Sequence, residues 1–295
     1  MARARSVCAP VPGGLWHIWL VRLLGGIALL GASFLVQAAG YTLAVVPQAS
    51  PSETYHRWVP FADQLQRVLG QPLQVRVYRT FDEFETDLVN GLADFAYMNP
   101  YHLIMARKAQ GYLPLIRDGS RLLSGLLVVR RDSPIKSVKE LNGKTIAFPD
   151  PNAYAASLYM RALLQEKANI RFTSQFLGTH GNVYRHVILG SVAAGSGVNV
   201  TLAREFPETR AELRVLYETP GTPPHPLCAH PRIPSELREA VARAVLELGK
   251  NENGRELLKR IDILKPVRAS YERDYQPLER LGLQKFSVQT GLSPR

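Results

Sequence analysis

Apolar and polar positions change their period along the chain, which predicts alternating strands and helices. Short runs of alternating or clustered apolar residues predict strands over residues 41–47, 73–77 and 93–97. Apolar residues that return every three or four positions predict helices over 58–69 and 81–89. The order strand, helix, strand, helix, strand is typical of a doubly wound α/β unit.

A second α/β unit follows along the chain. Strands are predicted over residues 125–130, 144–148, 171–177 and 213–218, and helices over 153–167 and 183–189. Gly195-Ser196-Gly197 lacks the dinucleotide-binding spacing and follows no clear strand, so we expect a turn there. After a proline-rich stretch over 220–234, helices are predicted over 237–248, 252–261 and 271–281. The pattern predicts an α/β protein with mostly parallel sheets flanked by helices.

The N-terminal segment has the features of an export signal. Residues 1–19 are basic and free of acidic residues, and the uninterrupted apolar run over 23–36 is short for a membrane span. Val36-Gln37-Ala38 offers small or modest residues at the recognition positions, so we expect cleavage after Ala38 and a periplasmic protein. The alternative is an uncleaved anchor, which the polar and small residues after the run disfavour. A lipoprotein anchor is excluded because no cysteine lies directly after the run.

Composition and charge narrow the class of protein. Hydrophobic residues make up 46% and charged residues 21%, which argues against disorder. The net charge is +11, but basic and acidic residues are interleaved without a basic and aromatic stripe, so nucleic acid is not an expected partner. Cys228 is the only thiol expected in the mature chain, which leaves no internal disulfide.

No motif predicts catalysis or a cofactor. The nucleophile elbow, the P-loop and the zinc-protease signature are all missing from the sequence, so we expect no enzyme. His225, Cys228 and His230 lie close together, but the prolines around them and the lack of a fourth ligand argue against a metal site.

Polar groups in strand-to-helix loops are the candidate ligand contacts, because open α/β sheets bind ligands at the carboxyl ends of their strands. The helix that opens at Ala153 offers free backbone N–H groups to an anion, with Asn152, Tyr154 and Ser157 nearby. The alternative is that Asp150 and Asn152 only cap this helix. His180 lies in a similar loop, where a ligand contact and a bond to backbone are equally good interpretations.

The turn centred on Asn99-Pro100 is a further candidate, although the aromatic residues that flank it, Tyr97 and Tyr101, also suit packing at a strand end.

Several segments together resemble a known family. They are Ser52–Gly70, the strand and preceding turn at Asn90–Tyr97, the stretches 131–135 and 141–148, and the loops Asp150-Pro151-Asn152 and Gly178–His180. In this order they resemble the periplasmic phosphate- and phosphonate-type binding proteins of ABC transporters, over about residues 41–265. The resemblance implies a type II periplasmic-binding-protein fold, in which two lobes close on a small ligand. After the export signal over 1–38, we expect a first lobe over 39–126 plus 222–295 and a second lobe over 127–221.

The sequence departs from this family at the expected anion site. Phosphonate-binding relatives carry Ser-Thr-Ser after Asp-Pro-Asn, whereas this chain has Ala153, Tyr154 and Ala155, so side-chain donors are lost and the helix N-terminus remains. His225 replaces an acidic residue of the relatives, and Tyr154 offers a ring on which a flat ligand can stack.

The resemblance implies an exported receptor that captures a small anionic, phosphonate- or phosphate-like ligand by lobe closure and delivers it to an ABC permease. The alternative is a periplasmic sensor that signals to a membrane kinase or a chemoreceptor. We expect a monomer without cofactor or metal, with ligand contacts at Tyr97, Asn99, Tyr101, Asn152, Tyr154, Ser157, His180 and His225.

Overall fold

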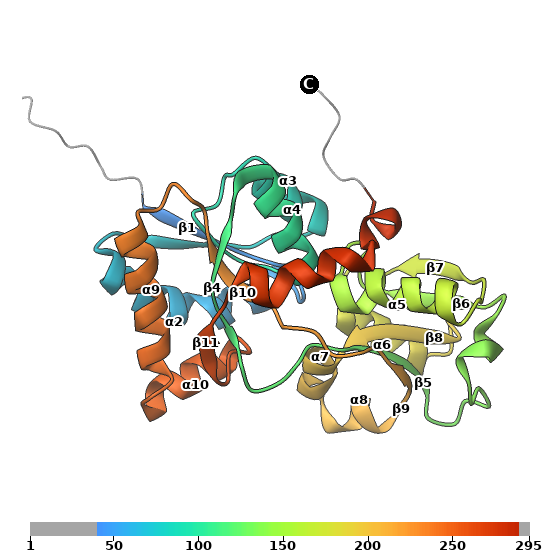
Figure 1. Cartoon of the computed structure of the whole chain (residues 1–295). Coiled ribbons are helices and arrows are strands. Elements are labelled where there is room, and N and C mark those ends of the chain that lie inside the picture. Colours follow the sequence, from blue (N-terminus) through green and yellow to red (C-terminus); the bar gives the residue numbers. More distant parts are fainter. Residues whose placement is uncertain (1–39, 289–295) are drawn as a thin grey trace, which may run out of the picture. The chain divides into compact units, whose positions relative to one another are not determined.

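The computed structural model describes residues 40–288, and these residues form two β-sheets with helices packed against them (Figure 1). The expected export signal and its cleavage site after Ala38 lie outside the described residues. Within residues 40–288, no helix is long and apolar enough to cross a membrane.

The first sheet has the strand order β11-β4-β10-β3-β1-β2. Its strands are β1 (Tyr41–Val45), β2 (Leu73–Arg76), β3 (Phe95–Tyr97), β4 (Leu113–Asp118), β10 (Pro226–Ala229) and β11 (Pro266–Arg268). Strand β1 pairs in parallel with β2 and β3, whereas β10, β4 and β11 join by antiparallel pairing. Its helices are α2 (Pro51–Leu69), α3 (Phe81–Val89), α4 (Pro100–Gln110), α9 (Ser235–Leu248) and α10 (Glu252–Arg260).

The second sheet has the strand order β7-β6-β8-β5-β9. Its strands are β5 (Gly125–Arg130), β6 (Thr145–Phe148), β7 (Thr173–Phe176), β8 (Ala194–Val198) and β9 (Leu213–Glu218). Strand β6 pairs in parallel with β7 and β8, and β5 pairs antiparallel with β8 and β9. Both sheets are therefore mixed, and the expectation of mostly parallel sheets is wrong. The antiparallel strands β5, β9 and β10 lie in or beside the segments through which the chain passes between the sheets.

Helices and turns complete the second part. A 3₁₀ turn spans Val138–Leu141, and a continuous helix consists of a π-helical segment Tyr154–Tyr159, α5 (Met160–Ala162) and a second π-helical segment Leu163–Lys167. It is called the 154–167 helix below. Helices α6 (His180–Ile188), α7 (Asn199–Arg204) and α8 (Pro207–Ala211) follow. The chain then returns to the first sheet and ends in short turns over Tyr271–Tyr275, Gln276–Leu281 and Leu283–Phe286.

Local signals in the sequence explain the long helix α2. The Ser50 hydroxyl accepts a hydrogen bond from the Glu53 backbone N–H, and Pro51 occupies the first turn, where its missing N–H costs nothing. Gly70 ends the helix in the left-handed conformation with φ of 65°. The buried face carries Trp58, Phe61, Ala62, Leu65 and Leu69, which is the predicted apolar stripe.

The expected turn at Gly195-Ser196-Gly197 is wrong, because these residues lie in strand β8 in the middle of the second sheet. Gly195 and Gly197 have no side chain because helix α6 packs directly on the strand. A Cβ atom on Gly197 would lie 1.9 Å from the Tyr184 hydroxyl oxygen, and one on Gly195 would lie 2.5 Å from Val183 Cγ1. The small residues thus reflect close packing rather than chain reversal.

Six further helices and strands were not predicted: α4, α7, α8, β4, β10 and β11. Strand β10 lies inside the proline-rich stretch and begins with Pro226. The nitrogen of this residue carries no hydrogen, so it cannot donate a hydrogen bond to a neighbouring strand. Its pairing with β3 on one side and β4 on the other makes it a central strand despite this weak local signal.

The two parts of the fold share packed side chains. The main core of the first sheet, which includes Leu43, Phe61 and Leu227, continues into the apolar face of the 154–167 helix through Tyr154, Leu158 and other residues. Two smaller clusters cover the second sheet. The first turn of the 154–167 helix therefore lies where the two parts meet.

Candidate functional site

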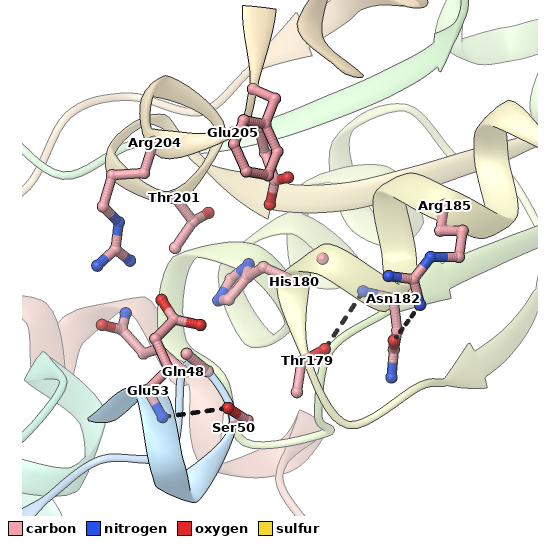
Figure 2. Close-up of a pocket in the computed structure, with 13 residues that line it drawn as sticks. Gln48, Ser50, Glu53, Thr179, His180, Asn182, Arg185, Thr201, Arg204 and Glu205 are labelled. Carbon is pink, nitrogen blue, oxygen red and sulfur yellow. Dashed lines mark hydrogen bonds between the residues drawn. The ribbon is translucent and has the colours of Figure 1, made fainter. Parts of the chain in front are cut away.

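A pocket of about 550 Å³ opens between the N-terminal ends of helices α2 and α6 and the end of α7 (Figure 2). We call it the outer pocket. Residues from both parts of the fold line it: Gln48, Ala49, Ser50, Glu53, Thr179, His180, Gly181, Asn182, Arg185, Thr201, Arg204, Glu205 and Phe206.

Two helix N-termini border the outer pocket. The Ser50 hydroxyl caps α2, and the Thr179 hydroxyl caps α6 by accepting from the Asn182 backbone N–H at 3.2 Å. The first-turn N–H groups of such helices carry partial positive charge and attract anions. The arginines Arg185 and Arg204 add positive charge, while the carboxyl groups of Glu53 and Glu205 add negative charge.

A second, much smaller cavity lies next to the outer pocket. We call it the inner cavity, and its volume of about 10 Å³ is room for about one water molecule. Both parts of the fold line it, through Gln48, Phe81, Asn99, Leu123, Ala153, Tyr154, Ala155, Ala156, His180, Val198 and His225. His180 and Gln48 border both cavities.

His180 is the first residue of α6 and is 4% exposed. Burial, with a smaller contribution from Arg204, lowers the pKa of its imidazole to about 3, so the ring is neutral at neutral pH. Its Nδ1 has no hydrogen-bond partner among the described residues. In Figure 2 the ring is directed toward the side of the pocket where Gln48, Glu53 and Arg204 lie. A neutral imidazole there can donate one hydrogen bond to a ligand.

His225 and Tyr97 form a buried aromatic wall. The two rings stack with centroids 5.5 Å apart, and Trp58 packs on Tyr97 at 4.6 Å. Burial, followed by the nearby His102, lowers the pKa of His225 to about 3. Its Nε2 lies 3.2 Å from the Gln48 side-chain nitrogen, so it accepts a hydrogen bond there. His225 borders the inner cavity, whereas Tyr97 supports it from behind.

Tyr154 lies at the start of the 154–167 helix, where the sequence predicts an anion seat. Its side chain is 2% exposed and stacks on Tyr159 with centroids 6.2 Å apart. Burial raises the pKa of its hydroxyl. The buried Tyr154 ring thus lies at the first turn of this helix and borders the inner cavity.

Asn152 and Asn99 are engaged in a buried network. The Asn152 amide donates to Glu85 Oε2 and to the Val288 carbonyl, both at 2.9 Å, and its oxygen accepts from the Val288 N–H at 3.0 Å. Asn99 caps α4 by accepting from the His102 N–H at 2.8 Å, and its amide donates to the Asn152 carbonyl at 3.3 Å. Of the two, only Asn99 borders the inner cavity.

Tyr101 and Ser157 line neither the outer pocket nor the inner cavity. The Ser157 hydroxyl accepts from Arg161 Nε at 3.1 Å, and Arg161 in turn donates to the Phe286 carbonyl at 2.8 Å. Tyr101 is half-buried, and burial raises the pKa of its hydroxyl, an effect that the Ser287 side chain partly offsets. Both residues therefore lie toward the C-terminal turns.

Sequence reasoning missed several residues of the outer pocket, notably Arg185 and Arg204. Arg204 ends helix α7, which directly follows strand β8. Because a turn was predicted in place of β8, the junction between this strand and α7 was not predicted, and Arg204 was not considered as a site residue. The polar loop after β1, with Gln48 and Ser50, was visible in the sequence as a loop of this kind.

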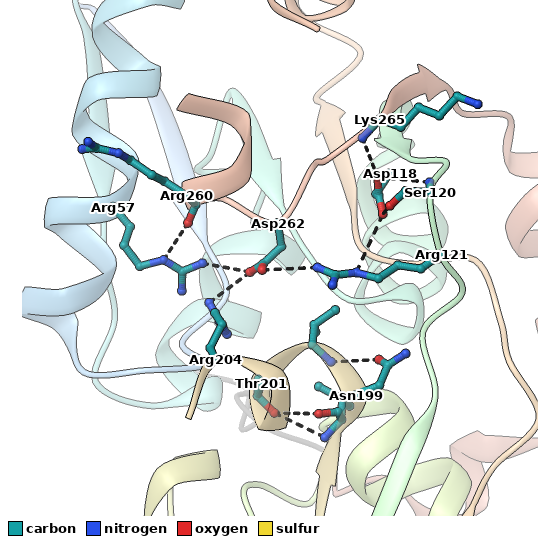
Figure 3. Close-up of polar contacts among 12 residues, drawn as sticks. Arg57, Asp118, Ser120, Arg121, Asn199, Thr201, Arg204, Arg260, Asp262 and Lys265 are labelled. Carbon is teal, nitrogen blue, oxygen red and sulfur yellow. Dashed lines mark hydrogen bonds and ion pairs between the residues drawn. The ribbon is translucent and has the colours of Figure 1, made fainter. Parts of the chain in front are cut away.

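Arg204 is held by an ionic cluster that joins the two parts of the fold (Figure 3). The Asp262 carboxylate lies 3.0 Å from Arg204, 2.8 Å from Arg57 and 3.6 Å from Arg121. Asp262 follows α10 beside the first sheet, whereas Arg204 ends α7 beside the second.

Metal-ligating residues do not gather in the described part of the chain: no group of three or more His, Cys, Asp or Glu side chains there could hold an ion. Cys228 is buried and unpaired in strand β10.

The protein has two mixed β-sheets flanked by helices and a pocket lined by both parts of the fold. These features define its class, the two-lobed type II periplasmic-binding-protein fold. Solved structures share this fold. A binding-protein component of an ABC phosphonate transporter from Pseudomonas aeruginosa is similar, with a TM-score of 0.74, 16% identity, and coverage of 86% of this chain and 90% of that one. A Prochlorococcus marinus protein in complex with methylphosphonate has the same TM-score and identity and covers 84% of this chain and 98% of its own. A Xanthomonas citri protein bound to ATP has a TM-score of 0.68 and 19% identity, with coverage of 83% and 97%.

The sequence identifies the family. The family model described as "ABC transporter, phosphonate, periplasmic substrate-binding protein" matches residues 43–275. The phosphonates-binding periplasmic protein of Escherichia coli (strain K12) is 24% identical over 268 residues, which cover 84% of this chain and 78% of that protein. The chain belongs to the family of periplasmic phosphonate-binding proteins of ABC transporters, and the resemblance and the two-lobed fold expected from the sequence are confirmed.

Proposed function

We propose that this protein captures a phosphonate- or phosphate-like anion in the outer pocket and delivers it to an ABC permease in the membrane. Its family consists of periplasmic substrate-binding proteins for transport, which favours transport over sensing. We further propose a monomer that is exported by cleavage after Ala38, with lobes at 39–126 plus 222–295 and at 127–221.

The observation that carries the proposal is the combination of His180 with the N-terminus of α6. The imidazole is buried and neutral, its Nδ1 has no partner among the described residues, and it faces a pocket large enough for a small solute. A hydrogen bond from this ring, together with the first-turn N–H groups and the two arginines that line the pocket, suits an oxyanion.

Binding and closure are coupled in this proposal because both lobes line the outer pocket. Gln48 and Glu53 come from the first part of the fold, and His180 and Arg204 from the second. A solute that contacts both sides is bound more tightly when the lobes are together, so it favours the closed state. The protein needs no chemistry for this task, since it captures and releases its ligand unchanged.

The test is a titration of the purified mature protein with phosphate, methylphosphonate and phosphate monoesters by calorimetry, with His180→Ala as the variant. Loss of a hydrogen bond to a charged ligand costs about 1.5–3 kcal/mol, so we expect His180→Ala to weaken binding roughly tenfold to a hundredfold. His186→Ala is the matched control, because His186 lies on the same helix but borders neither cavity. Its affinity is expected to equal that of the wild type.

Scattering in solution checks the closure step. The radius of gyration should fall when a binding ligand is added to the wild type. A protein that binds no phosphate or phosphonate compound at all, or that binds one without His180, contradicts the proposal.

A further inference from the structure

The two cavities differ so much in size that only one has room for a solute. The inner cavity of about 10 Å³ accommodates about one water molecule. The outer pocket of about 550 Å³ lies within the range of about 300–1,000 Å³ that is usual for small-molecule sites. A tetrahedral oxyanion has several times the volume of a water molecule and does not fit the inner cavity.

Tyr154 is the largest side chain that the start of the 154–167 helix contributes to the lining of the inner cavity. It stands on the first turn of the 154–167 helix and is almost fully buried. Its neighbours Ala153, Ala155 and Ala156 contribute only methyl groups to the same cavity. The ring therefore takes volume beside the first turn of this helix, whose free backbone N–H groups would otherwise be available to an anion.

We infer that Tyr154 determines specificity by excluding small oxyanions from the N-terminus of the 154–167 helix, so that the ligand binds in the outer pocket. The inference rests on the proposed function, in which the ligand is phosphonate- or phosphate-like. It assigns the oxyanion to the N-terminus of α6, where His180 Nδ1 is buried without a partner among the described residues and Arg185 lies one turn along.

The charges of the outer pocket indicate what the rest of the ligand carries. Glu53 and Glu205 line the pocket together with Arg185 and Arg204. Carboxylates accept hydrogen bonds and repel an anion, so the two glutamates suit hydroxyl groups of the ligand, whereas the arginines and the N-terminus of α6 suit its oxyanion. The ligand class is therefore a phosphate or phosphonate compound with a hydroxylated organic group, which is larger and more polar than methylphosphonate.

The first experiment is calorimetric titration of the wild type with three probes: methylphosphonate, phenyl phosphate and ribose 5-phosphate. We expect ribose 5-phosphate to bind at least tenfold more tightly than either of the others, because it alone combines size with hydroxyl donors. A wild type that binds methylphosphonate as tightly as ribose 5-phosphate overturns the inference while leaving the proposed function intact. A wild type that binds none of the three overturns both.

The second experiment tests the role of Tyr154 directly. Tyr154→Ala opens the inner cavity and should bind methylphosphonate at least tenfold more tightly than the wild type does. Tyr154→Phe keeps the ring and removes only the hydroxyl, so it should show no gain. Equal methylphosphonate affinity in folded Tyr154→Ala and wild type contradicts the exclusion.

If Tyr154→Ala does not fold, a third comparison tests whether the oxyanion binds in the outer pocket. Arg185→Gln changes an exposed side chain and should lose at least tenfold in affinity for ribose 5-phosphate. Arg210→Gln makes the same charge change at an exposed arginine that does not line the pocket, and should leave affinity unchanged. If Arg185→Gln binds ribose 5-phosphate as tightly as the wild type does, the oxyanion does not bind in the outer pocket and the inference is overturned.

Discussion

The residues that matter most at the site are neutral histidines in an apolar setting. His180 and His225 are each about 95% buried or more, with exposures of 4% and 5%, and burial is the main cause of the fall in their pKa values. At neutral pH both rings are uncharged, so they contribute hydrogen bonds to the site and no positive charge. This differs from a surface anion site, where a protonated histidine would supply part of the attraction.

These histidines predict that the fold loses stability as the pH is lowered. Their pKa values of about 3 lie below the ordinary 6.5, so below pH 6.5 the unfolded chain binds protons that the folded chain does not. The free energy of unfolding therefore falls as the pH drops from 6.5 toward 3, by about 2 kcal/mol per histidine between pH 7 and pH 5. Urea denaturation at the two pH values measures this loss.

Asp150 acts in the opposite direction over the same range. Burial raises its pKa from 3.8 to about 6, so it destabilises the fold above pH 6 and offsets about 1–2 kcal/mol of the loss at pH 5. The contribution of one histidine is isolated by His180→Asn, in which the fall from pH 7 to pH 5 should shrink by about 2 kcal/mol. His56→Asn, at an exposed position on α2, is the control and should leave the fall unchanged. A fall of wild-type size in His180→Asn would show that His180 is protonated in the folded protein.

At the scale of elements, close packing of α6 on β8 positions the site. Strand β8 is buried along its whole length, and Val183, Tyr184 and Val187 of α6 pack against it. The Tyr184 hydroxyl also bonds to Thr201 Oγ1 at 2.9 Å, which links α6 to α7. The orientation of His180 at one end of α6 and of Arg204 at the end of α7 thus depends on the small residues of β8.

A methyl group at Gly197 tests this packing. A Cβ atom there would overlap Tyr184, so we expect Gly197→Ala to lower the free energy of unfolding by about 2–3 kcal/mol. Gly181→Ala serves as the control, since the nearest atom to its Cβ would be 3.6 Å away and alanine favours the helix. Denaturant unfolding of both variants measures the difference, and equal stabilities would refute close packing at β8.

At the scale of the molecule, the Asp262 cluster joins the two parts of the fold next to the outer pocket. Its carboxylate is 11% exposed and faces Arg57, Arg121 and Arg204. Asp262 adopts a left-handed backbone conformation with φ of 63°, which asparagine also tolerates. Replacement by asparagine therefore removes the charge with little change to the backbone.

We expect Asp262→Asn to lower the free energy of unfolding by about 2–4 kcal/mol, because three guanidinium groups lose their shared counter-ion. Since Arg204 is held across the two parts, the ligand-free variant should also show a larger radius of gyration in solution scattering. Asp132→Asn removes an aspartate from an exposed pair with Arg130 and should change neither quantity measurably. A variant as stable and as compact as the wild type would show that the cluster does not hold the lobes.

Much of the fold could be predicted from local patterns. The buried faces of α2 and α3, their caps at Ser50 and Thr80, and the left-handed glycine at 70 all act within a few residues of one another. The same holds for strand β5, whose apolar run coincides with the predicted range. Family motifs distributed over the chain then predicted the two-lobed fold and its role in transport. These features were determined by the sequence because their causes are short-range.

The lining of the site depends on contacts that only the tertiary structure shows. The strand nature of Gly195–Gly197 depends on pairing with β5 and β6, and that of β10 on pairing with β3 and β4. The family resemblance implies that Tyr154 replaces a hydroxyl residue of the relatives, but only the tertiary structure shows that its ring is buried beside the inner cavity. Likewise, Arg204 and Asp262 are far apart in the chain. Such contacts form between distant segments, so their partners cannot be read from the residues on either side.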